Sequence, residues 1–166
     1  AAKDIELQGH LDEAIEGCHK AIACDPAYAS AHQWRAWYFL AVGKLEEMLA
    51  SMKMALKLDP LSPIINAHMG YALFCAGRHD EALTQLTSAL SLDPDFALTY
   101  WPLGAVHVWQ RNGEEAIRAF RSLVELTRGA VGLGYLGITA GVFGRPDIAE
   151  EALARLEELA RERYVS

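Results

Sequence analysis

The stretch LSPIINAHMGYALFCAGRHDEALTQLTSALSLDP, residues 61–94, sets a pattern that most of this chain follows. It ends in an Asp-Pro pair, and the same pair stands at Asp59-Pro60 and at Asp25-Pro26. The three prolines are evenly spaced, since 94 − 60 = 34 and 60 − 26 = 34. A fixed period of this size is typical of stacked repeats, in which one unit cannot bury its apolar face alone.

Within this stretch the pattern is that of two amphipathic helices. Ser62 can cap a helix that has Pro63 in its first turn, and apolar residues then recur at helical spacing until Gly77 ends the helix. A second amphipathic segment follows Arg78 and runs to the Asp-Pro pair. Gly70 is small where the two helices would have to approach closely. The stretch therefore predicts a helix–turn–helix hairpin.

The neighbouring segments repeat these landmarks with some departures. The preceding unit has Met48 at one of the small positions, and the following unit has its glycine, Gly113, two places late. Together the units resemble the tetratricopeptide repeat (TPR) family, whose small residues and proline are matched in the central unit by Gly70, Gly77, Ala82, Ala89 and Pro94.

The resemblance implies an all-α fold, a right-handed α-solenoid of stacked helix–turn–helix hairpins, that forms a single domain over residues 1–166. The expected repeats are a partial one over 1–26 and four more over 27–60, 61–94, 95–129 and 130–163. Their first helices are expected near 27–41, 62–76, 95–111 and 130–143, and their second helices near 45–57, 79–91, 113–127 and 146–163. In the partial repeat, Gly9 is expected to mark the turn after the end of a first helix.

Composition excludes several classes of function. The chain is 52% apolar and 22% charged, and its net charge of −7 disfavours a nucleic-acid surface, which needs a basic face. No apolar run approaches the ~18 residues of a membrane span. The cysteines Cys18, Cys24 and Cys75 lack paired metal spacing, which predicts reduced thiols in a cytoplasmic protein.

Apparent chemical motifs have simpler explanations. Residues 132–137, GLGYLG, match a dinucleotide fingerprint, but the segment before them has a helical pattern where that fingerprint needs a strand. The histidines show no metal-type cluster, and no nucleophile elbow is present. We therefore expect no cofactor, no metal and no catalytic residues, and hence a protein that is not an enzyme.

The resemblance also implies where a partner would bind. TPR proteins line a concave groove mainly with their first helices, and the matching positions here are aromatic and nearly uncharged. The predicted peptide- or protein-binding residues are Gln33, Trp34, Trp37, His68, Tyr71, Phe74, Trp101, Trp109 and Tyr135, with Leu40, Ile64, Leu98, Pro102, Val108, Ile138 and Val142 beside them.

These residue types favour one mode of recognition. Family members that clamp a terminal carboxylate use Lys, Arg and Asn at such positions, so we expect instead an apolar groove for an amphipathic helix or an extended peptide with apolar anchors. Trp37 and Phe74 could also turn inward between helices, which would shrink the patch. Pro102, if it lies deep within a helix, is expected to bend the groove wall.

The predicted function is a non-catalytic protein–protein interaction scaffold. Its groove could be covered by a peptide partner, by another part of a larger protein or by a second copy of the chain, and open repeat ends could also stack. The repeats are similar to arrays in bacterial signalling proteins, including winged-helix regulators, class III cyclases and serine/threonine kinases. A regulatory or oligomerisation domain of such a protein is therefore the alternative.

Overall fold

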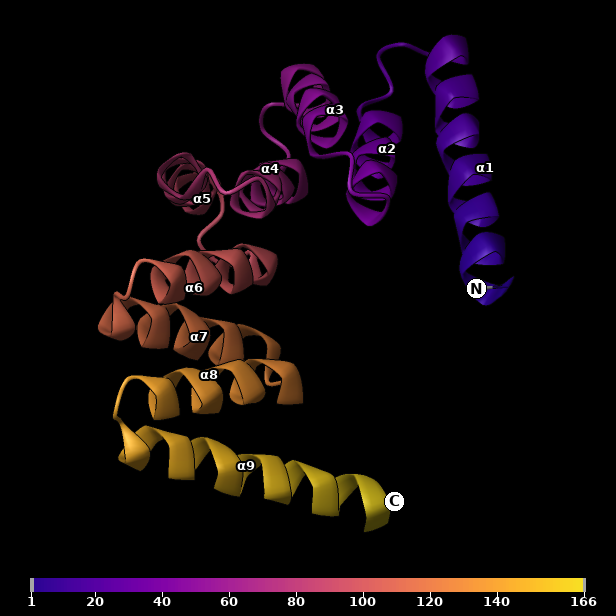
Figure 1. Cartoon of the computed structure of the whole chain (residues 1–166). Coiled ribbons are helices and arrows are strands. Elements are labelled where there is room, and N and C mark those ends of the chain that lie inside the picture. Colours follow the sequence, from indigo (N-terminus) through magenta and orange to yellow (C-terminus); the bar gives the residue numbers. More distant parts are fainter. Residues whose placement is uncertain (1, 166) are drawn as a thin grey trace. The chain divides into compact units, whose positions relative to one another are not determined.

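The computed structural model describes the backbone of residues 2–165 and the side chains of residues 9–162. All regular structure within the described residues is helical, and they form no strand (Figure 1). This confirms the all-α fold of helical hairpins. The elements are α1 (Ala2–Cys24), α2 (Ala29–Ala41), α3 (Leu45–Leu58), α4 (Pro63–Cys75), α5 (His79–Leu92), the 3₁₀-helix η1 (Ala97–Thr99), α6 (Tyr100–Trp109), α7 (Gly113–Thr127), α8 (Ala130–Val142) and α9 (Pro146–Val165).

The chain divides into two compact units, one up to Leu92 and one from Asp93 onward. In the first unit α1 packs against α2, α2 against α3, α3 against α4 and α4 against α5. In the second unit α6 packs against α7, α7 against α8 and α8 against α9. Each hairpin of the pattern is thus a pair of helices adjacent in sequence, and within each unit neighbouring hairpins stack on one another.

A side-chain cap starts α4 where the sequence predicts it, and short turns follow two of the Asp-Pro pairs. The Ser62 side chain accepts a hydrogen bond from the Ile65 N–H at 3.5 Å, and Pro63 is the first residue of α4. At two of the Asp-Pro pairs the aspartate accepts from the backbone two residues on, with Asp25 Oδ1 3.0 Å from the Ala27 nitrogen and Asp93 Oδ1 3.1 Å from that of Asp95. The Asp-Pro pair therefore combines a side-chain turn with a residue that cannot continue a helix.

Gly70 is small because α4 and α5 approach closely at that point. A Cβ added to Gly70 would lie 2.4 Å from Leu86 Cδ2, and Leu86 is fully buried. Gly104 in α6 has the same role, since its Cβ would lie 2.5 Å from the Phe120 ring of α7. A large side chain on the second helix fills the space that the glycine leaves.

The turn inside each hairpin has one repeated geometry. Gly77 has a φ of +74°, and its N–H donates to the Phe74 carbonyl at 3.0 Å. In the hairpin of α6 and α7 the equivalent residue is Arg111, which has a φ of +61° and donates to the Val108 carbonyl at 3.1 Å. Arg111 thus adopts the left-handed conformation that glycine adopts elsewhere.

Gly113, which the sequence pattern places two residues late, has a packing role instead. It is the first residue of α7, and a Cβ there would lie 2.6 Å from Cγ of Phe143. The displaced glycine therefore makes room for an aromatic ring of the next hairpin, while the turn is left to Arg111.

The turn expected at Gly9 is wrong, because α1 runs through it without a break. Continuing the helix satisfies the backbone groups, and a glycine in a helix interior costs only about 1 kcal/mol relative to alanine. Gly9 alone therefore does not end α1.

The helix expected over residues 95–111 is also shorter than predicted. A 3₁₀ turn precedes it, and α6 begins only at Tyr100. Pro102 is therefore the third residue of the α-helix, where a backbone N–H would have no partner within the helix. The expectation that Pro102 bends the groove wall from deep within a helix is wrong.

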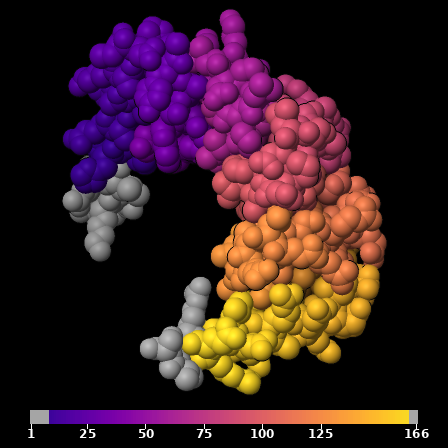
Figure 2. All heavy atoms as spheres, turned by 180° about the vertical axis from the view of Figure 1, so that it is seen from behind, coloured from indigo at the N-terminus to yellow at the C-terminus, as the bar shows by residue number. Residues whose placement is uncertain are grey.

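Each unit has its own apolar core. In the first unit Met48, Met52 and Leu86 are the largest fully buried side chains. In the second unit one cluster joins α7, α8 and α9 through side chains that include Phe120, Leu133 and Ile148. Figure 2 shows the side chains of this unit, coloured orange to yellow, packed continuously from helix to helix.

We predict that Gly70→Ala lowers the free energy of unfolding of the first unit by about 1–3 kcal/mol, because the added methyl overpacks a filled core. Gly17→Ala is the matched control in the same unit, since its Cβ would meet nothing within 4 Å. That change should stabilise the unit by about 0.5–1 kcal/mol. Urea denaturation of both variants measures the difference, and equal effects would contradict the close approach at Gly70.

Arg111→Gly should raise the free energy of unfolding by about 0.5–1 kcal/mol. Glycine relieves the strain of the left-handed conformation, and this gain exceeds the stability lost because glycine makes the unfolded chain more flexible. Arg118→Gly, at an exposed position inside α7, is the control and should lower it by about 1 kcal/mol. Thermal unfolding distinguishes the two. A loss of stability in both variants would show that Arg111 is not strained.

Candidate functional site

The candidate site is the set of first helices in each unit: α2 and α4 in the first, and α6 and α8 in the second. The helices α4, α6 and α8 contain no Asp, Glu, Lys or Arg. The second helices α5, α7 and α9 begin with acidic residues, and α7 and α9 also carry arginines. Apolar and uncharged residues are therefore concentrated on one helix of each pair.

In the first unit, a polar contact joins the two first helices. The Gln33 side-chain amide donates a hydrogen bond to Nδ1 of His68 at 2.6 Å. Gln33 is buried, and His68 is half-buried. Because the amide nitrogen can only donate, Nδ1 must be the accepting nitrogen and the ring proton lies on Nε2. The pair therefore requires a neutral His68.

Burial explains why His68 stays neutral. Desolvation disfavours the charged imidazolium and lowers the pKa of His68 from 6.5 to about 4. The ring of Trp37 also approaches His68 edge-on, with ring centroids 4.6 Å apart. His68 thus acts as an uncharged, planar packing element at neutral pH.

Aromatic rings continue from this contact along α4. Trp37 lies 5.4 Å from Tyr71, Tyr71 lies 6.5 Å from Phe74, and Phe74 lies 5.4 Å from His79. All of these side chains are half-buried. The predicted residues of the first unit are therefore brought together, but as a packed aromatic row in which each ring covers part of the next.

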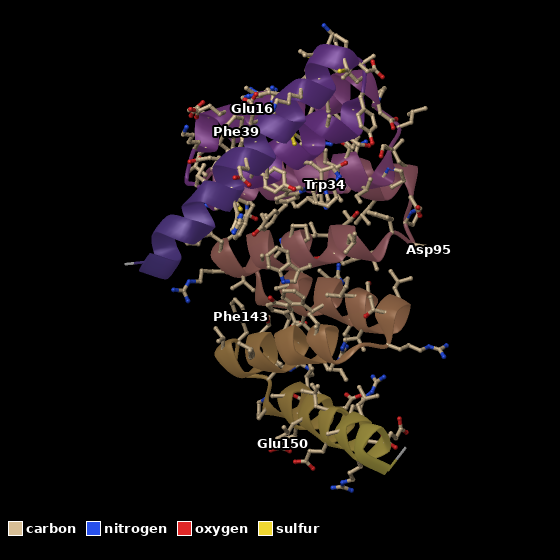
Figure 3. The ribbon with its side chains drawn as sticks, turned by 90° about the vertical axis from the view of Figure 1, so that its right-hand side faces the viewer. Glu16, Trp34, Phe39, Asp95, Phe143 and Glu150 are labelled. Atoms are coloured by element: carbon tan, nitrogen blue, oxygen red, sulfur yellow. The ribbon has the colours of Figure 1, made fainter. Side chains whose placement is uncertain are left out.

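Trp34 differs from this row. It is 57% exposed, so more than half of this residue, which Figure 3 labels, faces solvent. Phe39 on the same helix lies on the side of α1, with its ring 6.5 Å from that of His19. In the first unit, Trp34 is the predicted residue with the most surface available to a partner.

In the second unit, Tyr135 joins α8 to its neighbours. Its ring stacks on Phe120 of α7 at 5.5 Å and meets Trp101 of α6 edge-on at 5.7 Å. Trp101 is half-buried, whereas Trp109 at the end of α6 is 65% exposed. The buried Phe120 ring thus lies against the inner side of Tyr135. The sequence pattern predicted Phe120 only as a core residue and gave no sign of this contact.

Three further residues of α8 lie on the same face as Tyr135 and are strongly exposed: Val131, Ile138 and Val142. Val131 is absent from the predicted set, although it follows from the same positional pattern as Leu98. Pro102, which that set includes, is buried and cannot contact a partner directly.

The chemistry available at these faces is that of apolar contact. Among the described residues no group of three His, Cys, Asp or Glu side chains is placed to hold a metal ion. Residues 132–137 lie within α8 and follow helix α7, which confirms the helical pattern expected before them. None of the described helices is long and apolar enough to cross a bilayer.

Comparison with known proteins places the fold. Residues 70–110 match the family model described as TPR repeat. No curated protein sequence matches the chain.

Solved structures share the fold over nearly the whole chain. MamA from Desulfovibrio magneticus RS-1 is 19% identical with a TM-score of 0.77, covering 96% of this chain and 91% of its own. TTC0263, a thermophilic TPR protein of Thermus thermophilus, is 20% identical with a TM-score of 0.79, covering 98% and 92%. YrrB, a TPR protein with an unusual peptide-binding site, is 18% identical with a TM-score of 0.66, covering 95% and 81%.

We predict that acid weakens the first unit through His68. A histidine whose pKa is lower in the folded chain binds fewer protons when folded, so its contribution to stability is present above pH 6.5 and is lost as pH falls towards about 4. Denaturant unfolding at several pH values measures this slope. His68→Phe should reduce the slope between pH 6.5 and 4, and an unchanged slope would show that His68 does not cause it.

Proposed function

From an array with the fold of TPR proteins and a TPR repeat at residues 70–110, we propose that this chain is a non-catalytic scaffold that binds apolar protein segments on its first-helix faces. The observation that carries the proposal is the exposure of large apolar side chains on helices that have few or no charges. Trp34 and Trp109 are more than half exposed, and Leu98 and Ile138 are as well.

Energetics support an anchor role for the tryptophans. A protein in water gains nothing by exposing such rings, whereas burying apolar surface against a partner is favourable by about 25 cal/mol per Å². Tryptophan is a frequent energetic anchor because its ring is large and rigid and loses little conformational entropy on binding. Trp34 in the first unit and Trp109 in the second are therefore the proposed anchors.

The packed aromatic row has a supporting role in this proposal. Trp37, His68, Tyr71 and Phe74 hold one another in fixed positions through ring contacts. A floor of fixed rings lowers the entropy that binding would cost. Gln33 is proposed to act indirectly, since it is buried and orients His68.

The partner suited to these faces is an amphipathic helix or extended peptide with aliphatic or aromatic anchors. A terminal carboxylate or an acidic segment would find no cation on α4, α6 or α8. All three cysteines are free thiols, which favours a reducing compartment such as the bacterial cytoplasm.

The test is a selection from a displayed peptide library, followed by calorimetry on the selected peptides. Trp34→Ala or Trp109→Ala should weaken binding by about 2 kcal/mol, which is roughly 30-fold in Kd. Leu153→Ala is the matched control, because Leu153 is also an exposed apolar residue but lies on the second helix α9. If both tryptophan variants kept the fold and bound the peptides with wild-type affinity, the proposal would be wrong.

A further inference from the structure

The outward face of α8 is an apolar stripe that the described structure leaves uncovered. Val131, Tyr135, Ile138 and Val142 follow one another at intervals of four, three and four residues, which places them on one side of a helix. Val131 and Ile138 are each 69% exposed, and Val142 is 62% exposed. A contiguous apolar surface of this kind marks an interaction site.

Two glycines lie on the same side of α8 and create hollows in the stripe. Gly134 and Gly141 are both in the helix, and a Cβ added to either one would meet nothing within 4 Å. These glycines therefore do not serve packing within the chain, in contrast to Gly132, whose Cβ would lie 3.3 Å from the Val124 backbone. The space above them is open to an approaching side chain.

The order of large and small residues along this stripe is self-complementary. When two antiparallel helices are related by a two-fold axis at Ile138, residues whose numbers sum to 276 face each other. Gly134 then faces Val142 of the second copy, and Tyr135 faces Gly141 of the second copy. Each glycine thus lies opposite a large side chain, and Ile138 lies opposite Ile138 of the second copy. We propose that α8 is a self-association surface, on which a second copy of this chain packs its own α8 antiparallel to the first.

Charge favours this face over the rest of the surface for contact between two copies. The chain carries a net charge of −7, so two copies repel each other over most of their surface. The α8 segment has no charged residue. Arg145, which follows it and faces Val131 of the second copy in this register, is paired with Glu114 at 3.0 Å and with Asp147 at 3.2 Å. Two copies can therefore meet at α8 without burying an unpaired charge.

The available area predicts a weak dimer. Fully burying an aliphatic side chain removes roughly 60–120 Å² from water, so four large residues give on the order of 400 Å² per copy. Stable interfaces bury about 800 Å² per partner. Dimerisation through α8 is therefore expected only at high protein concentration. This inference rests on the proposed function, since it names a second copy of the chain as the partner of the α8 face.

Disulfide trapping tests the register. In a chain whose Cys18, Cys24 and Cys75 are changed to alanine, Ile138→Cys places two thiols at the two-fold axis. Val131→Cys is the matched control, because Val131 is equally exposed but the two copies of it lie about 21 Å apart along the helices. Under mild oxidation at high protein concentration, Ile138→Cys should cross-link about tenfold faster than Val131→Cys, since a disulfide needs Cα atoms within ~7 Å. Equal rates would overturn the proposal.

Sedimentation equilibrium gives an independent readout in the chain with native cysteines. Ile138→Glu brings two carboxylates together at the axis and should raise the dimer Kd at least about tenfold, with unchanged thermal unfolding because the side chain is exposed. A wild-type chain that stays monomeric at the highest concentration would also overturn the proposal. A monomeric chain could still bind peptides through Trp34 or Trp109. The dimer experiment therefore tests the α8 proposal alone, and the peptide-binding experiment tests the proposed function.

Discussion

The close approach of paired helices is the constraint on which the other features depend. At Gly70 and Gly104 the absence of a side chain lets Leu86 and Phe120 reach across the hairpin. Phe120 then has a second contact, because its ring also stacks under Tyr135 of the next hairpin. One buried side chain thus closes a hairpin and supports the exposed face beside it. If this hairpin opened, Phe120 would no longer lie against Tyr135, and the exposed face would lose that contact.

A division of charge between helices follows from this arrangement. Within the second unit, the ionised residues of the helices lie on α7 and α9, where ion pairs such as Arg118–Glu115 are exposed. The helices α6 and α8 are left free of charge. Charged second helices are well hydrated, while uncharged first helices can be desolvated at little cost. The partner in the proposed function would meet the uncharged side of each hairpin.

The sequence predicts helices well where local signals agree, and less well where geometry decides. Ser62, Gly77 and the Asp-Pro pairs mark ends that the structure confirms to within a few residues. The turn at Arg111 could not be predicted, because only the shared hydrogen-bond pattern reveals that an arginine replaces glycine there. For the site, helical position predicts which side a residue faces but not what covers it. Gln33 is buried and contacts His68, which lies 35 residues away in the sequence. A local pattern cannot predict such a contact.

The aromatic row of the first unit has a mechanical consequence. Trp37 on α2 contacts both His68 and Tyr71 on α4, so ring against ring fills the space between two successive hairpins. The hairpins could tilt towards each other on that side only if these contacting rings moved. The ring row therefore acts as a spacer that limits how closely these two hairpins can tilt together. The spacing of these hairpins thus depends on their side chains as much as on their helices.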